Sequence, residues 1–389
     1  MVIIFWASLF LIFYTFFGYG ILLYFLVKLR NMVMGKRPIP DNGGKWPTVS
    51  VIIAAYDEED FIADKITNTL SLDYPADKIQ YIFVTDGSTD RTPGIIAQYP
   101  QIKLMHRPER GGKVAAMDRA MTEVNTEIVI FTDANTVLNN QALRNICRHY
   151  HDPSVGAVSG EKRVQIEEKS DATAGEGFYW KYESKLKIWD SELYTVVGAA
   201  GELFSLRTNL FEPVPPDTIL DDFMMTMLIT QKGYRIIYER DAYASESGSE
   251  NVSEELKRKV RIAAGGIQSI LRLKPSMNPF HNFWLAFQFV SHRVLRWTIT
   301  PFLMMLAFIL NFILVVRGCG GIYLLLFVLQ ALFYASALLG WLLERRRVRV
   351  KALFIPYYFC MMNYAVAAGI RRYFLKQQSA AWEKSKRKI

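Results

Sequence analysis

The stretch Tyr81–Asp90, YIFVTDGSTD, decides the fold, because a run of apolar and β-branched residues leads directly into an acidic turn. Such a run predicts a buried strand, and the Asp-Gly-Ser ending predicts a tight turn. A second stretch, Ile128–Thr136, IVIFTDANT, repeats this arrangement with an acid at the same place. In an open α/β sheet, ligands bind beyond the carboxyl ends of the strands. We therefore expect Asp86 and Asp133 to face one crevice.

The same alternation extends along the chain on both sides of these stretches. Short β-rich runs that alternate with helical patterns predict βαβ units and a doubly wound, largely parallel sheet of the α/β class. After residue 155 the pattern is less regular. The expected strands are 49–55, 80–85, 102–106, 127–132, 194–206 and 235–244, and the expected helices are 58–70, 92–98, 113–124, 141–150, 175–190 and 254–273.

Long apolar segments flank this domain and predict membrane helices. The chain has 389 residues, of which 51% are hydrophobic, and a mean hydropathy of +0.10. A helix needs about 20 apolar residues to cross a bilayer. The uncharged segments are 2–27, 298–316, 318–343 and 352–370. We predict an anchor at 1–28, a Pro- and Gly-rich linker at 29–47, the α/β domain at 48–275, an interfacial amphipathic helix at 276–297, a membrane region at 298–370 and a basic cytoplasmic tail at 371–389.

Charge predicts the orientation of these segments. Lys28, Arg30, Lys36 and Arg37 follow the first apolar run, and cytoplasmic flanks collect Lys and Arg. The α/β domain should therefore be cytoplasmic, in a multi-pass protein of the cell's inner (plasma) membrane. A full crossing by 352–370 would export the basic tail, so we expect that segment to be re-entrant or interfacial, which leaves three crossings.

Cysteine usage and charge exclude several classes of protein. Cys147, Cys319 and Cys360 are scattered, which argues against a disulfide framework or a zinc site. The formal net charge is +9, and the basic residues cluster beside the apolar segments. Anionic membrane lipids explain that placement better than nucleic acid does, because no nucleic-acid recognition motif accompanies it.

Four motifs in order carry a family resemblance. They are Val49–Glu58 (VSVIIAAYDE), Asp86-Gly87-Ser88, Asp133-Ala134-Asn135 and Asp221-Asp222. This series resembles family 2 glycosyltransferases over about residues 49–270, and less specifically the membrane-bound group that makes cellulose, hyaluronan and poly-N-acetylglucosamine. The resemblance implies a GT-A fold, a Rossmann-like nucleotide-sugar domain.

The resemblance also implies which residues bind the donor. Ala55, Tyr56 and Glu58 would hold the nucleobase, and Asp86 would receive the uracil or ribose. Lys113, after Arg110-Gly111-Gly112, would place a positive charge on the diphosphate, although a helix start with a solvated lysine has the same pattern.

A metal site is implied at the family's Asp-x-Asp element, where Asp133 and Asn135 stand. Mg²⁺ or Mn²⁺ takes oxygen ligands and neutralises charge on a departing diphosphate. Asn135 offers a neutral carbonyl in place of the second acid. Asp133 is therefore the stronger candidate ligand.

By the same resemblance, Asp222 is the general base, with Asp221 in support. A neighbouring acid can raise the base's pKa, although two acids at a helix N-terminus have the same pattern. Glu202 and Gln268 are candidate acceptor residues. The family's Gln-x-x-Arg-Trp element is not matched at Gln268, which puts processive synthesis in doubt.

Two later segments are interpreted as membrane contacts rather than as catalytic elements. Arg296-Trp297 begins an apolar segment and fits an interfacial anchor. The tail motif Trp382–Arg387 fits a basic segment on anionic lipid.

These expectations define one leading hypothesis. The chain would be an inverting, metal-dependent transferase that moves a sugar from a nucleotide diphosphate, implied to be UDP, to a growing polysaccharide or lipid-linked glycan. Membrane lipids and export or assembly partners would accompany it. Two alternatives stay open: transfer of a single sugar to a lipid carrier, and a catalytically silent membrane scaffold.

Overall fold

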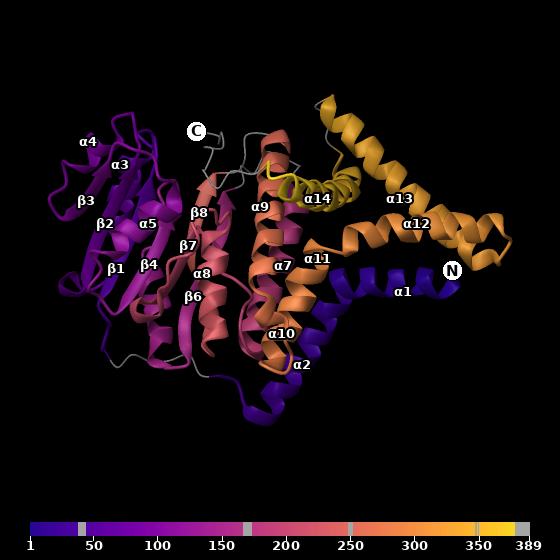
Figure 1. Cartoon of the computed structure of the whole chain (residues 1–389), viewed down its shortest axis with the longest axis horizontal. Helices are drawn as coiled ribbons and strands as arrows, with labels where there is room; N and C mark the ends of the chain where they lie inside the picture. The colour runs from indigo at the N-terminus through magenta and orange to yellow at the C-terminus, as the bar shows by residue number, and fades with distance from the viewer. Residues whose placement is uncertain (38–43, 166–172, 248–251, 347, 349, 378–389) are drawn as a thin grey trace.

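The computed structural model describes residues 1–37, 44–165, 173–247, 252–346, 348 and 350–377. The centre of the expected linker and the tail motif Trp382–Arg387 lie outside these residues. The described chain forms an α/β unit with a group of apolar helices that project from one side of it (Figure 1).

The α/β unit is built on one eight-stranded sheet with the order β3-β2-β1-β4-β7-β6-β8-β5. The first four strands in this order are parallel, whereas β7 runs antiparallel to β4 and to β6. β6 and β8 pair in parallel, so the sheet is mixed, with β7 and β5 running antiparallel to their neighbours. The strands are β1 Val49–Ala55, β2 Ile79–Asp86, β3 Ile102–Arg107, β4 Ile128–Asp133, β5 Val137–Leu138, β6 Val155–Gln165, β7 Leu203–Arg207 and β8 Arg235–Ser247.

Helices cover both faces of the sheet, as the alternation of buried residues in β1 requires. Val51 and Ile53 face one core with α3 Ile62–Leu70, α4 Thr92–Ile96 and α6 Ala142–Cys147. Ile52 faces the other core with α5 Lys113–Met121 and α8 Asp221–Gln231. Parallel strands buried on both faces read as continuous apolar runs, which explains why the sequence predicts this half so well. The doubly wound arrangement is confirmed here.

Two long helices form a further layer beside the sheet, α7 Thr173–Leu193 and α9 Val252–Arg272. The N-terminal helices contact α7, and α14 Lys351–Phe374 lies along α9. The backbones of α14 and α9 can approach closely because residue 369 is a glycine. A Cβ at this position would lie 2.5 Å from the Cβ of Ala263. The apolar helices are thus packed directly against the layer formed by α7 and α9.

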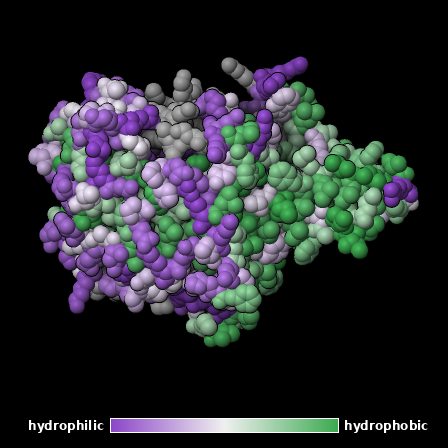
Figure 2. All heavy atoms as spheres, viewed as in Figure 1, coloured by the Kyte–Doolittle hydropathy of each residue, from purple (hydrophilic) through white to green (hydrophobic). Residues whose placement is uncertain are grey.

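Among the residues that the structure describes, three helices are long and apolar enough to cross a membrane: 2–34, 321–345 and 351–374. A fourth span results if the bent pair 283–297 and 300–316 is counted as one. The projecting helices carry the main apolar surface (Figure 2). Their elements are α1 Val2–Phe13, the π-helix η1 Tyr14–Gly18, α2 Tyr19–Met34, α12 Thr300–Val316 and α13 Gly321–Arg345.

The segment expected to be re-entrant or interfacial is one unbroken helix, α14. Pro356 and Asn363 both lie inside this helix without interrupting it. The helix is long enough to span a membrane. It nevertheless runs across the direction of α1 and α12 and is seen nearly end-on in Figure 1. An interfacial position for α14 stays a prediction.

The expected interfacial helix at 276–297 is divided into α10 Phe283–Phe289, the π-helix η6 Val290–Val294 and α11 Leu295–Trp297. Leu285 and Phe289 are buried in the core that also contains α8. His292 is fully buried and contacts carboxylates of α7. The polar residues of this segment therefore form ion pairs inside the protein, where we expected contacts with lipid headgroups.

Candidate active site

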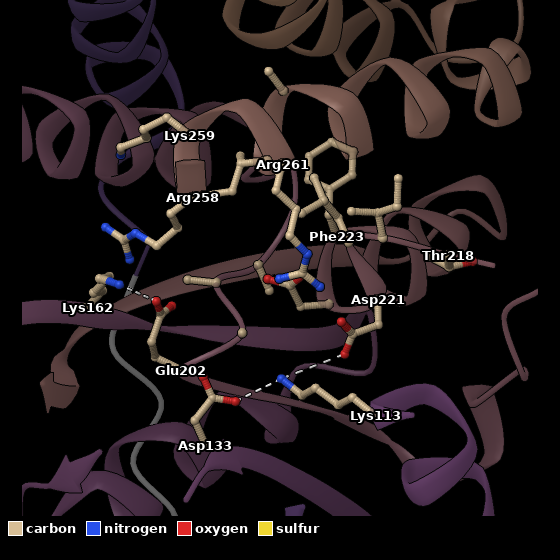
Figure 3. Close-up of a pocket in the computed structure, with 18 of the residues that line it drawn as sticks. Lys113, Asp133, Lys162, Glu202, Thr218, Asp221, Phe223, Arg258, Lys259 and Arg261 are labelled. Carbon is tan, nitrogen blue, oxygen red and sulfur yellow. Dashed lines mark hydrogen bonds and ion pairs between the residues drawn. The ribbon is translucent and has the colours of Figure 1, made fainter. Parts of the chain in front are cut away.

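A cavity of about 1030 Å³ lies between the carboxyl ends of the strands and the helices α7, α9, α11 and α14. It is lined by Lys113, Asp133, Glu202, Asp221 and Asp222, which all stand among the residues that the sequence predicts (Figure 3). The structure thus brings the phosphate, metal, acceptor and base candidates into one site.

Lys113, the candidate phosphate-binding residue, lines this cavity. It is the first residue of α5 and follows Gly112, whose φ of +94° favours glycine. Its Nζ lies 2.8 Å from an Asp133 carboxylate oxygen and 3.9 Å from one of Asp221 (Figure 3). Burial alone would lower the pKa of Lys113, but the carboxylates of Asp133 and Asp221 raise it above its ordinary range. Lys113 is therefore a fixed positive charge.

Asp86 acts on this site through the backbone. Its carboxylate accepts hydrogen bonds from the N–H groups of Gly111 and Gly112, at 2.8 and 2.6 Å, and lies 3.5 Å from Arg119. The side chain is buried and does not line the cavity. The structure therefore places Asp86 where it fixes the loop before Lys113.

Asp221 and Asp222 are the first two residues of α8. Burial, and next the charge of Asp221, raise the pKa of Asp222 from 3.8 to about 7. Lys113 and a backbone hydrogen bond act in the opposite direction. A carboxylate with a pKa near neutral pH is well matched to general-base catalysis. Both acids also occupy a helix N-terminus. The interpretation as a helix-capping pair and the interpretation as a general base with a supporting acid are therefore compatible.

The residues expected at the nucleobase, Ala55, Tyr56 and Glu58, differ in whether their side chains are buried or stack on a residue that lines the cavity. The guanidinium of Arg110 lies over the Tyr56 ring, 3.7 Å from its centre, and Arg110 lines the cavity. Ala55 ends β1 and is buried. The side chain of Glu58 is fully buried, whereas its backbone N–H binds Thr92. Glu58 therefore does not present its carboxylate to the cavity.

The metal-binding candidates are divided by the structure. Asp133 faces the cavity, but Asn135 does not line it, and the Asn135 side-chain oxygen is buried. Within the described ranges no group of three or more His, Cys, Asp or Glu residues could hold a metal ion. A Mg²⁺ site usually contains one or two carboxylates together with substrate phosphates. Asp133 fits such a site if diphosphate oxygens provide further ligands.

The acceptor candidates are also divided. Glu202 lines the cavity and forms an ion pair with Lys162 of β6. Burial would raise the pKa of Glu202, but Lys162 holds it below its ordinary range. Gln268 is buried outside the cavity, where its amide accepts from the N–H of Ile219 at 2.9 Å and donates to the carbonyl of Asp217 at 2.8 Å. Gln268 therefore braces the loop before α8.

Sequence reasoning missed Arg293 and Trp297, which both line the cavity. Trp297 packs on Gly266 and its ring centre lies 5.5 Å from that of Phe223, so it cannot serve only as an interfacial anchor. A sequence signal for these two residues did exist. Residues 293–297 read Arg-x-x-Arg-Trp, which has the same Arg-Trp ending as the family's Gln-x-x-Arg-Trp element that we looked for near Gln268. Arg293 lies in η6 and Trp297 ends α11, which places the Trp297 ring against Phe223 of α8.

Comparisons with known proteins agree with this geometry. Residues 50–214 match the family described as Glycosyl transferase family 2 and form such a domain. The chain is 29% identical over 240 residues to a beta-monoglucosyldiacylglycerol synthase of Synechocystis sp., covering 58% of this chain and 49% of that protein. It is 27% identical over 265 residues to a poly-beta-1,6-N-acetyl-D-glucosamine synthase of Staphylococcus aureus, covering 65% and 62%. The chain thus spans about half to three fifths of these relatives.

The fold is shared with a mannosyltransferase from Pyrobaculum calidifontis, whose structure was solved in complex with GDP-Man and Mn²⁺. The TM-score is 0.71 at 23% identity, and the match covers 96% of this chain and 100% of that one. The GT-A fold implied by the motif series is therefore confirmed.

Proposed function

We propose that this chain is an inverting glycosyltransferase that moves a sugar from a nucleotide diphosphate to an acceptor bound against α14. The observation that carries the proposal is the position of Asp222, whose raised pKa suits a base, in the same cavity as Lys113 and Asp133. A silent scaffold is disfavoured because all three side chains are present and meet in that cavity.

The chemistry follows from these positions. Asp222 removes the proton of an acceptor hydroxyl as its oxygen attacks the anomeric carbon, while the bond from that carbon to the diphosphate breaks. Lys113 stabilises the negative charge that develops on the leaving nucleotide diphosphate. Attack opposite the leaving group inverts the anomeric configuration. A divalent cation held by Asp133 would add further positive charge at the diphosphate.

The acceptor end of the cavity supports an acceptor with an apolar portion. Met362, Ala365 and Val366 of α14 line it together with Trp297. α14 is joined to α13, a helix apolar enough to span a membrane. A lipid or lipid-linked acceptor could therefore place its apolar part against α14 and its hydroxyl near Asp222. Such an arrangement serves transfer of one sugar to a lipid carrier and growth of a lipid-linked glycan equally.

The remaining parts of the proposal concern location and donor. The catalytic domain would lie at the cytoplasmic face of the cell's inner membrane, where nucleotide sugars such as UDP-sugars are made available. The apolar helices and the basic flanks support this placement. Export or assembly partners would be required only if the product is a polymer.

The experiment is to incubate membranes that contain the full chain with a panel of nucleotide sugars and to follow nucleotide diphosphate release and labelled product. We expect one donor to be used, with release dependent on Mg²⁺ or Mn²⁺. A single radiolabelled lipid band indicates transfer of one sugar, whereas a ladder indicates polymerisation. Release that is equal in membranes carrying the Asp222→Asn variant would overturn the proposal.

A further inference from the structure

Lys187 of α7 is a buried lysine whose side chain lines the acceptor part of the cavity. Only 8% of its surface is exposed, and its ammonium lies 5.3 Å from the centre of the Tyr238 ring. Among the residues that the structure describes, no carboxylate forms an ion pair with this ammonium. A buried charge is costly unless it is paired. A ligand that supplies negative charge would remove this cost.

A second cation stands close to Lys187 in the same wall. Arg293 lines the cavity, and its positive charge acts on Lys187 together with the charge of Glu183. Glu183 does not neutralise both, because its two oxygens are already held by Arg293 and Arg296 at 2.9 Å each and by His292 at 3.1 Å. Burial also lowers the pKa of Lys187 from its ordinary value. Arg293 is therefore paired with Glu183, whereas no carboxylate of the described residues lies within ion-pair distance of the Lys187 ammonium.

These cations are separate from the donor side. The charges acting most strongly on Lys187 are those of Glu183, Arg293, Glu202 and Glu161, whereas Lys113 is governed by Asp133, Asp221 and Asp222. A diphosphate bound at Lys113 would thus not neutralise Lys187. Asp133 and Asp221 lie 2.8 and 3.9 Å from Lys113, whereas within the described residues neither forms an ion pair with Lys187.

The cavity is also rich in basic residues. Ten basic and six acidic side chains of the described chain line it. Glu246 and Glu255, behind the wall, pair with several of the basic residues, yet basic residues still outnumber acidic ones. The basic residues are Arg110, Lys113, Lys162, Lys187, Lys257, Arg258, Lys259, Arg261, Arg293 and Arg372, and the acidic residues are Asp133, Glu183, Glu202, Asp221, Asp222 and Glu254. A neutral acceptor would gain little from this surplus.

We propose that Lys187 and Arg293 bind a phosphate group of the acceptor, so that the acceptor is an anionic lipid rather than a neutral one. This inference rests on the proposed function and deepens it. The phosphate would lie between the two cations, the acceptor's alkyl part would extend toward Met362, Ala365 and Val366, and its reacting hydroxyl, separate from the phosphate, would be near Asp222. Arginine and lysine are suited to phosphate because their hydrogen bonds to it are charge-assisted.

The test compares two amphiphiles that differ only in charge. The full chain in phosphatidylcholine nanodiscs is titrated calorimetrically, without donor, with dodecyl phosphate and with its uncharged dimethyl ester. We expect the anionic form to bind about 10- to 100-fold more tightly, the effect of one charge-assisted hydrogen bond. Inorganic phosphate, titrated in the same way, should bind weakly because it lacks the alkyl chain. Tight binding of inorganic phosphate would assign the site to a free anion and overturn the lipid assignment.

The variant Lys187→Met distinguishes a binding role from a structural one. Replacing a buried, unpaired cation with an apolar side chain of similar length should leave the thermal midpoint unchanged or raise it. The same change should abolish the preference for dodecyl phosphate. Lys185→Met, on the exposed side of the same helix, is the matched control and should keep the preference.

The outcomes separate the two proposals. Equal binding of the charged and uncharged amphiphiles by the wild type, or an unchanged preference in Lys187→Met, would overturn the phosphate site even if sugar transfer is demonstrated. Loss of nucleotide diphosphate release with every donor would instead overturn the proposed function, because the binding titration contains no donor.

Discussion

Replacing Asp222 by asparagine should have opposite effects on catalysis and on stability. The substitution removes the base but leaves Lys113 and Asp133 in place, so donor binding should change little. Loss of a general base typically lowers the rate by ~10²–10⁴. Because burial raises the pKa of Asp222, the ionised form of this side chain is disfavoured in the folded protein. Asparagine cannot ionise and should relieve that cost.

The size and sign of the stability effect follow from the pKa. A rise from 3.8 to about 7 corresponds to about 4 kcal/mol, since a change of 1 in pKa is worth about 1.4 kcal/mol. The folded chain holds a proton on Asp222 that the unfolded chain has lost between pH 3.8 and about 7, so wild-type stability falls as pH rises through that window. The Asn variant should therefore be more stable by up to about 4 kcal/mol above pH 7 and by little below pH 4.

Three measurements check this reasoning. Calorimetric titration should show unchanged donor affinity, and wild-type kcat/KM should rise with pH through about 7 as Asp222 ionises. Thermal unfolding at pH 4 and pH 8 should show a gain for the variant only at the higher pH. Asp77→Asn, at an exposed position, is the control and should change neither rate nor stability. A variant that retains wild-type turnover, or one that is destabilised at pH 8, would refute the assignment of Asp222.

Three further predictions concern the metal ligand, the packing beside α8 and the topology of the C-terminus. Asp133→Ala should weaken donor binding in the presence of Mn²⁺ and make donor binding insensitive to a chelator. If donor binding by the wild type does not depend on metal, Asp133 is not a metal ligand. Gly198→Ala should lower the thermal midpoint, because its Cβ would lie 2.1 Å from the Phe223 ring, and overpacking typically costs about 1–3 kcal/mol. Gly233→Ala, which has a similar positive φ and open space, should lower it less. A tag after Ile389 should not react with an impermeant reagent on intact cells if α14 is interfacial.

The first half of the fold could be read from the sequence because its strands are continuous apolar runs that end in acids. The predicted range 49–55 coincides with β1, and β2 and β4 begin and end within one residue of prediction. β6 was missed because Val155–Gln165 includes two glycines and a charged stretch, which give no apolar pattern. Its pairing with β8 contains irregularities that only the assembled sheet can stabilise.

The residues of the candidate site likewise fall into those that the sequence predicts and those that it does not. Lys113, Asp133 and Asp222 could be predicted because each directly follows or begins a regular element, and the fold fixes where those ends meet. Lys187 and Trp297 could not, because their position depends on how distant helices pack. Gln268 shows the opposite error: its residue type suits an acceptor, but its side chain points to the loop of Ile219. Local pattern predicts an element's end better than a helical side chain's direction.

The apolar helices are part of the site rather than only its anchor. Tyr19, at the start of α2, donates to Asp190 of α7, and the second oxygen of Asp190 lies 2.6 Å from His292. The other ring nitrogen of His292 faces Glu183, which holds Arg293 at the cavity wall. This buried network crosses the domain boundary that we expect at residue 275. Because removing one partner from a buried ionic network leaves a charge uncompensated, the N-terminal apolar helix also helps to determine where Arg293 lies in the cavity wall.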